Sequence, residues 1–152
     1  MQTLTTAHDR LKADYQSFSD TCTTKVDGYD KKLKTLDDQI DRMNRDIVQL
    51  KGERHTLSTA IEELTTRLAG TITCPECGYE FLVSDKTFDV TEGTADLKEK
   101  NAAFEAVISR IAGCEKIVSD IEKEEQQIRT DKRSLSAENS VWNDKLEQAA
   151  RQ

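Results

Sequence analysis

The residue pair best suited to chemistry lies near the middle of the chain, where Cys74 and Cys77 occur in a Cys-Pro-Glu-Cys-Gly segment. A Cys-x-x-Cys followed by glycine is typical of a knuckle, a tight turn in which both sulfurs point the same way and backbone amides can donate hydrogen bonds to them. Structural zinc takes four ligands in a tetrahedron, and thiolates are among its preferred ligands. The segment therefore predicts a Zn2+ site with Cys74 and Cys77 as two of its ligands.

Few other residues can complete such a site. Both histidines, His8 and His55, lie well before the cysteine pair in the sequence. Cys22 and Cys114 occupy positions in an apolar periodicity, where a free cysteine behaves as a small buried hydrophobe. We therefore expect the same cysteine pair of a second chain to complete a four-cysteine site on a two-fold axis.

Three other interpretations of the cysteine pair stay open. A Cys-x-x-Cys can be a thioredoxin-type redox pair, although the βαβ pattern that accompanies such a pair is missing from this sequence. A zinc ribbon within one chain would need a second Cys-x-x-Cys, which the sequence also lacks. The third interpretation is a knuckle that no longer binds metal.

The residues before the cysteine pair form a first predicted arm, 1–70. Apolar residues recur there at alternating steps of three and four, the spacing that keeps side chains facing one partner helix in a coiled coil. The series contains one charged residue, Arg54, and has one additional step of four in its early part. Its members are Leu11, Tyr15, Phe18, Cys22, Val26, Tyr29, Leu33, Leu36, Ile40, Met43, Ile47, Leu50, Arg54, Leu57, Ile61, Leu64 and Leu68.

The residues after the cysteine pair form a second predicted arm, 94–152, with the same spacing. Four of its positions are polar, namely Lys100, Glu125, Lys132 and Asn139. Polar residues at such positions lower stability but can fix the register of the two helices. The series is Leu97, Lys100, Phe104, Val107, Ile111, Cys114, Val118, Ile121, Glu125, Ile128, Lys132, Leu135, Asn139, Trp142, Leu146 and Ala149.

Between the arms lies a predicted apex, 71–93, in which the period stops. Gly70 is expected to end the first arm in a left-handed conformation, and Thr94, after Gly93, to cap the second arm. Two β-prone stretches, 71–73 and 79–83, predict a small hairpin around the cysteines.

Two arms joined by a short apex should lie antiparallel. We expect Leu68 to face Leu97, which also brings Gly52 and Gly113 to one level. Two glycines at one level would permit close approach of the helices or a bend, unless their pairing is a coincidence.

Composition supports this architecture. Of the 152 residues, 34% are charged, 5% are aromatic and one is proline. This charged fraction is too high for a compact domain with a large core, and the regular spacing of the apolar residues is not typical of a disordered chain. We predict an all-α fold: a long antiparallel coiled-coil hairpin with a small β-hairpin zinc knuckle at its tip, dimerising tip to tip.

Charge and hydropathy exclude several classes of function. The net charge of −7 leaves no general basic surface for nucleic acid, so no direct nucleic-acid binding is expected. The sequence has no apolar run of membrane-spanning length and no signal-peptide pattern at its start. We therefore expect no membrane association, reduced cysteines and a cytoplasmic location.

The segment Cys74-Pro75-Glu76-Cys77 between two matched coiled-coil arms resembles the zinc hook of the SMC-like double-strand-break repair ATPases, the SbcC-like family, or a related hook-bearing ATPase. In that family a Cys-Pro-x-Cys at the apex of an antiparallel coiled coil joins two molecules through one shared zinc. The resemblance implies ATPase heads beyond both arms, an Mre-type nuclease among the partners, and a role in DNA repair or DNA-directed defence.

The sequence contains no Gly-x-x-x-x-Gly-Lys-Ser/Thr phosphate loop, so we expect a non-enzymatic segment of a longer ATPase. Its predicted function is zinc-mediated homodimerisation and tethering. The alternatives are a Cys-x-x-Cys redox switch and a free-standing coiled-coil adaptor. Tyr79, Phe81 and Phe88 are candidates either for packing around the zinc site or for a small core of the apex itself.

Overall fold

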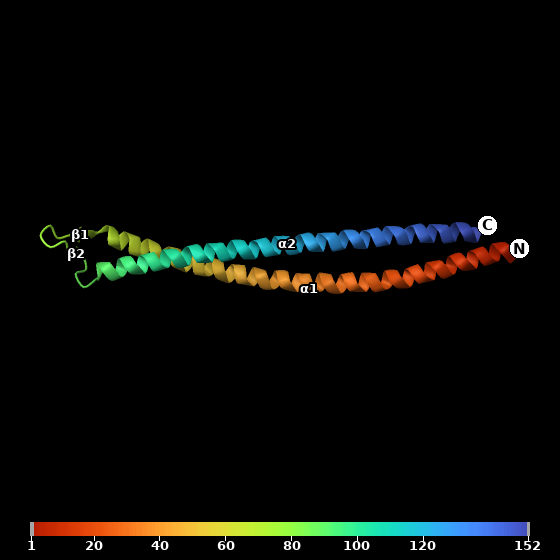
Figure 1. The fold of residues 1–152 in the computed structure, drawn as a ribbon, viewed down its shortest axis with the longest axis horizontal. Helices are drawn as coiled ribbons and strands as arrows, with labels where there is room; N and C mark the ends of the chain where they lie inside the picture. The colour runs from red at the N-terminus through yellow and green to blue at the C-terminus, as the bar shows by residue number, and fades with distance from the viewer. Residues whose placement is uncertain (1, 152) are drawn as a thin grey trace. The chain divides into compact units, whose positions relative to one another are not determined.

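Two long helices and a two-stranded hairpin make up the structure, a computed structural model that describes residues 2–151 and the side chains from residue 6 onward. Helix α1 spans Gln2–Ala69, strand β1 Thr71–Thr73, strand β2 Glu80–Leu82 and helix α2 Val90–Arg151 (Figure 1). The predicted helical hairpin with a β-hairpin between its arms is confirmed at this level. The chain forms two compact units. The first unit combines the residues up to Asp41 with those from Ser119 onward, and the second unit is Arg42–Val118.

The predicted apolar series is the buried stripe of both helices. Every member of the two series is buried or half-buried except Arg54, which is exposed. A stripe of this kind gives each helix a face that must be covered by another helix, and tertiary packing of such a face supplies most helix stability.

In the first unit, α1 and α2 run antiparallel and contact each other through their stripes. The ring of Phe18 stacks on Trp142 with centroids 5.7 Å apart. The Tyr15 hydroxyl donates a hydrogen bond of 3.3 Å to Asn139 Oδ1, so this polar stripe position bonds across the two helices. Lys132 does the same through its ammonium group, 2.6 Å from Asp30 Oδ1. Asn139 and Lys132 thus each have a partner on α1 in the observed register.

Glu125 is the exception among these polar positions, because it is buried, with 4% of its surface exposed. Arg129, one turn further along α2, reaches its Oε2 at 3.2 Å. Its Oε1 is buried without a hydrogen-bond donor among the described residues. Burial, and then a hydrogen bond with the nearby carboxyl group of Asp37 on α1, raise the pKa of Glu125. Two carboxyl groups can share a hydrogen bond only when one of them carries a proton.

Replacing Glu125 with glutamine should therefore stabilise the first unit at pH 7 by about 1 kcal/mol, since an amide donates to Asp37 without needing a proton. The raised pKa means that the contribution of Glu125 to stability is greatest below its unfolded pKa and is lost as the pH rises through the folded value. The advantage of the Glu125→Gln chain should thus shrink as the pH is lowered.

Urea unfolding of both chains at a series of pH values measures this difference. Glu124→Gln is the matched control, because Glu124 is exposed and its ion pair with Lys32, at 2.9 Å, should contribute little. A Glu125→Gln chain that is less stable than the parent at pH 7, or whose advantage is independent of pH, would contradict this account of the buried carboxyl group.

In the second unit the core gathers around Leu50, which packs with Val107 and Ile111 of α2. Leu57 and Cys114 are partly buried against the same cluster. Cys114 therefore lies in apolar packing, as predicted. A side chain at Gly52 or Gly113 would meet nothing within 4 Å, so neither glycine is needed for a close approach of the helices.

The helix ends differ from the prediction at two positions, Gly70 and Thr94. The predicted left-handed conformation at Gly70 is wrong: its amide donates to the carbonyl of Arg67 at 3.2 Å, and the positive φ angle belongs to Gly78. The predicted N-cap at Thr94 is also wrong. Helix α2 begins at Val90, because Asp89 Oδ1 accepts the amide of Glu92 at 3.0 Å.

The first turn of α2 lies beside the last turn of α1. Gly93 falls in the first turn of α2, and a side chain there would lie 3.6 Å from Leu68. Leu68 therefore lies close to Gly93, which is one helical turn from its predicted partner Leu97 on the same helix. Neither helix contains an apolar stretch that could cross a bilayer, as far as the described residues show.

Candidate metal centre

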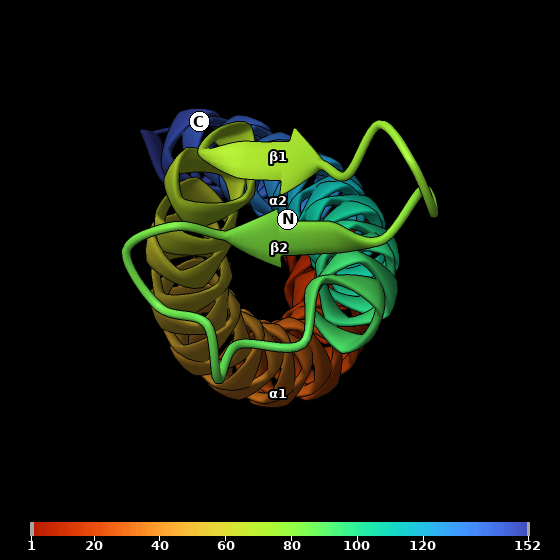
Figure 2. The same ribbon diagram turned by 90° about the vertical axis from the view of Figure 1, so that its left-hand side faces the viewer.

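The cysteine pair is carried by the predicted hairpin, whose strands β1 and β2 pair antiparallel. Ile72 lies opposite Phe81, with one residue pair on either side of them. Figure 2 looks onto this hairpin, which lies in front of the last turn of α1 and the first turn of α2. Leu82 is 1% exposed and comes close to Gly70, so one face of the hairpin is anchored at the helix end.

The turn between the strands has the geometry of a knuckle. The amide of Cys74 donates to the carbonyl of Tyr79 at 2.8 Å, which extends the ladder by one pair. The amide of Gly78 donates back to the carbonyl of Cys74 at 2.9 Å, and Gly78 has φ of 73°. A residue with a side chain adopts this conformation only with strain, which explains why glycine follows the second cysteine.

This turn brings the two cysteines together. Cys74 and Cys77 approach each other to 3.3 Å in the hairpin, so both side chains are near enough to bind one metal ion. Cys74 is half-buried and Cys77 is exposed, so a metal ion can reach the pair. The pair therefore fits two corners of a zinc tetrahedron.

The knuckle also favours the metal-binding form of Cys74. Hydrogen bonds from the backbone amides of Cys77 and Glu76, and from the Cys77 thiol, lower the pKa of Cys74. Because the thiolate is the species that binds metal, a lowered pKa reduces the competition from protons.

The described residues offer no third ligand to this pair. No group of three or more His, Cys, Asp or Glu side chains that could hold a metal ion occurs among them. His55 is exposed on α1 and His8 is half-buried there. Cys22 is a half-buried member of the α1 stripe, and Cys114 belongs to the Leu50 cluster.

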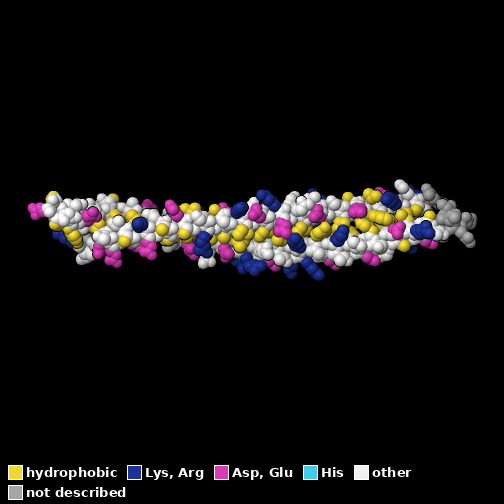
Figure 3. Space-filling view, viewed as in Figure 1, with side chains coloured by type: hydrophobic (Ala, Val, Ile, Leu, Met, Phe, Trp, Pro, Cys, Tyr) yellow, Lys and Arg dark blue, Asp and Glu magenta, His cyan; other side chains and the backbone are white. Residues whose placement is uncertain are grey.

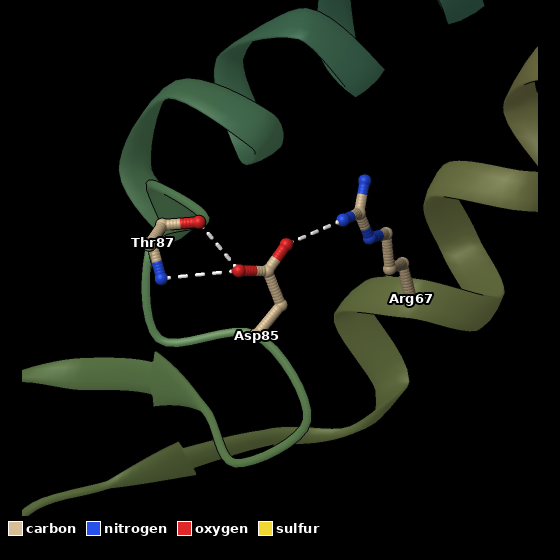
Figure 4. A network of polar contacts seen from close by, with 3 residues as sticks. All are labelled: Arg67, Asp85 and Thr87. Carbon is tan, nitrogen blue, oxygen red and sulfur yellow. Dashed lines mark hydrogen bonds and ion pairs between the residues drawn. The ribbon is translucent and has the colours of Figure 1, made fainter.

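Sequence reasoning missed the contacts that hold the base of the hairpin. Arg67, in the last turn of α1, lies 2.8 Å from Asp85 in the loop between β2 and α2 (Figure 4). The same carboxyl group accepts hydrogen bonds from the hydroxyl of Thr87 at 2.6 Å and from its amide at 3.1 Å. The hydrogen bonds from the Thr87 hydroxyl and amide lower the pKa of Asp85, and the positive charge of Arg67 lowers it further. These contacts tie the hairpin loop to the end of α1.

Phe88 belongs to this base. Its ring lies under the guanidinium of Arg67, 4.5 Å from the ring centroid, in a cation–π contact. Its edge also occupies the space above Gly93. Of the three aromatic candidates, Phe88 therefore packs at the helix ends, while Tyr79 and Phe81 lie on the hairpin and stack on each other at 6.2 Å.

The hairpin carries uncompensated negative charge near the cysteines. Asp85 is paired with Arg67, and Asp89 caps α2, but Glu76 and Glu80 are exposed in and beside the knuckle. Figure 3 shows acidic side chains at the hairpin end of the molecule.

No protein-family model, curated protein or solved structure matches this chain. The relation to the zinc-hook family therefore stays a prediction, based on Cys74-Pro75-Glu76-Cys77 and on the helical arms on either side of it.

Proposed function

We propose that this chain is a zinc-mediated homodimerisation and tethering module. The observation that supports it most is that two cysteines, Cys74 and Cys77, approach each other to 3.3 Å with no third ligand among the described residues. Structural zinc needs four ligands, and a second chain offers two more of the same kind. Two chains sharing one zinc would satisfy the metal with the residues that each chain supplies.

The remaining features of the hairpin suit this role. Hydrogen bonds from the amides of the knuckle lower the pKa of Cys74, which favours its metal-binding form, and Gly78 gives the turn its shape. The ion pair of Arg67 with Asp85 joins the loop after the hairpin to the end of α1, so the cysteines are attached to the helix ends. When bound, zinc supplies a strong link between two such hairpins and no reaction, since all its positions are filled by sulfur.

In this proposal the dimer connects the helical arms of two chains. Each hairpin is mounted on the ends of α1 and α2, so joining two hairpins joins two pairs of arms. By resemblance to the zinc-hook family, the arms belong to a longer SMC-like ATPase whose heads act on DNA in repair or defence with a nuclease partner. The segment itself binds and tethers, and catalysis belongs to the heads.

A second candidate function, a redox switch, is favoured by the same closeness of the two cysteines. A disulfide between Cys74 and Cys77 would form when an oxidant of the thiol–disulfide class accepts two electrons and both thiol protons are released. The lowered pKa of Cys74 would assist its attack on such an oxidant. Bound metal distinguishes the two functions, because a disulfide has no thiolates to offer zinc.

Titration with Co2+ tests the proposed ligand set. Cobalt in a tetrahedral four-thiolate site shows sulfur-to-metal charge transfer and intense visible absorption, both of which weaken as oxygen replaces sulfur. We expect a four-sulfur spectrum that saturates at about half an equivalent of Co2+ per chain, as four cysteines from two chains require. The Cys22→Ser/Cys114→Ser chain, as control, should give the same end point. Saturation at one equivalent with a spectrum of two sulfurs would contradict a shared site.

A further inference from the structure

The hairpin exposes an apolar face that its own fold does not cover. Ile72 is 47% exposed, Tyr79 63% and Val83 59%. Phe81, half-buried, lies among them, opposite Ile72 and stacked on Tyr79. We call these four residues the outer face. Exposed apolar side chains that cluster in this way mark an interaction surface more often than scattered ones do.

The outer face is not needed for attachment of the hairpin to the helices. Side chains alternate between the two faces of a strand, so Phe81 and Leu82 point to opposite sides. Leu82 is the residue that is buried at the helix end. Attachment therefore uses the inner face, together with Arg67 and Asp85 at the base.

The first cysteine lies on the same side as the outer face. The register pairs Thr73 with Glu80, and the hydrogen bond from the Cys74 amide to the Tyr79 carbonyl continues it by one pair. Two residues along a strand share a face, so Cys74 follows Ile72 on the outer face and lies opposite Tyr79. A chain that completes a metal site at Cys74 would thus approach over these apolar side chains.

We infer that the outer face packs against the outer face of a second copy of this chain, around the shared metal site. This inference rests on the proposed function and adds a self-complementary apolar contact to it. In a two-fold arrangement the same patch serves both partners, so Ile72, Tyr79 and Val83 of each chain would be covered together. Their burial would offset the repulsion between the exposed Glu76 and Glu80 of the two hairpins.

The test compares two pairs of substitutions in the zinc-loaded full chain. Ile72→Thr/Val83→Thr removes apolar surface from the outer face but keeps a β-branched side chain both in β1 and just after β2. Val48→Thr/Val141→Thr is the matched control, because these valines are 70% and 52% exposed on the helices. We expect the dissociation constant of the dimer to rise about tenfold or more for the outer-face pair and to be unchanged for the control.

Cobalt spectra separate a lost interface from a damaged hairpin. The outer-face pair should keep the four-sulfur spectrum once the protein concentration exceeds its raised dissociation constant. Tyr79→Gln, which lies outside both strands, is a second variant that leaves the ladder intact and should weaken the dimer in the same direction.

The outcomes are distinguishable. Dimers of unchanged affinity in both Ile72→Thr/Val83→Thr and Tyr79→Gln, with zinc still shared, would overturn this inference and leave the proposed function standing. A parent chain that binds zinc without dimerising would overturn the proposed function, and this inference with it.

Discussion

The Cys74→Ser/Cys77→Ser chain should lose zinc and the dimer together. Serine hydroxyls stay protonated at neutral pH and are poor zinc ligands, so both halves of the proposed site disappear at once. Helix content should barely change, because the helices are held by buried residues such as Leu36, Leu50 and Ile111 rather than by the hairpin. Sedimentation analysis and metal content after purification measure the two losses.

The other two cysteines provide the control. In the Cys22→Ser/Cys114→Ser chain, zinc content and dimerisation should match those of the parent, at a packing cost of about 1 kcal/mol. Cys114 packs with Leu57 against the Leu50 cluster, which accounts for that cost. A dimer that persists in Cys74→Ser/Cys77→Ser would show that the arms, and not the metal, hold the two chains together.

Gly93→Ala should destabilise the chain by about 1–3 kcal/mol, although alanine is the better helix former. A methyl group at Gly93 would lie 2.5 Å from Cζ and 2.9 Å from Cε1 of Phe88. The guanidinium of Arg67 lies over the face of this ring, so the ring must leave its cation–π position to make room for the methyl group. Thermal unfolding followed by circular dichroism measures the change in midpoint.

Gly113→Ala, the same substitution on the same helix, should have the opposite sign. A methyl group there would meet nothing within 4 Å, so the chain gains only the helix propensity of alanine, about 1 kcal/mol. If Gly93→Ala also raises the midpoint, then Phe88 does not pack on α2 as described.

The arms were predictable from the sequence because their stability is spread over many repeats of one pattern. The series from Leu11 to Ala149 identifies the buried stripe, and one wrong member, Arg54, does not change the outcome. Its long side chain reaches solvent from a position beside the stripe. The hairpin was predictable for a similar reason, since β-prone residues flank a turn that requires glycine at position 78.

The ends of the elements were less predictable because single contacts decide them. Asp89 and Glu92 have the spacing of a capping box, a signal that identifies the start of α2 better than Gly93 and Thr94 do. The ion pair of Arg67 with Asp85 joins residues 18 apart and follows no periodicity.

The candidate metal centre was predicted from its cysteines, and the structure adds their closeness and the amides that favour the Cys74 thiolate. Of the outer face, the sequence singled out Tyr79 and Phe81 as candidates for packing around the zinc site, whereas Ile72 and Val83 look in the sequence like ordinary apolar residues of a hairpin. The exposed fraction of these side chains separates them from the nearby Leu82, which is buried.

Native mass spectrometry of the zinc-loaded chain tests the shared site most directly, because one spectrum reports chains and metal ions in the same particle. The account predicts a species of two chains and one zinc ion, which acid converts to metal-free single chains as Cys74 and Cys77 protonate. A single chain that carries its own zinc ion would contradict the account.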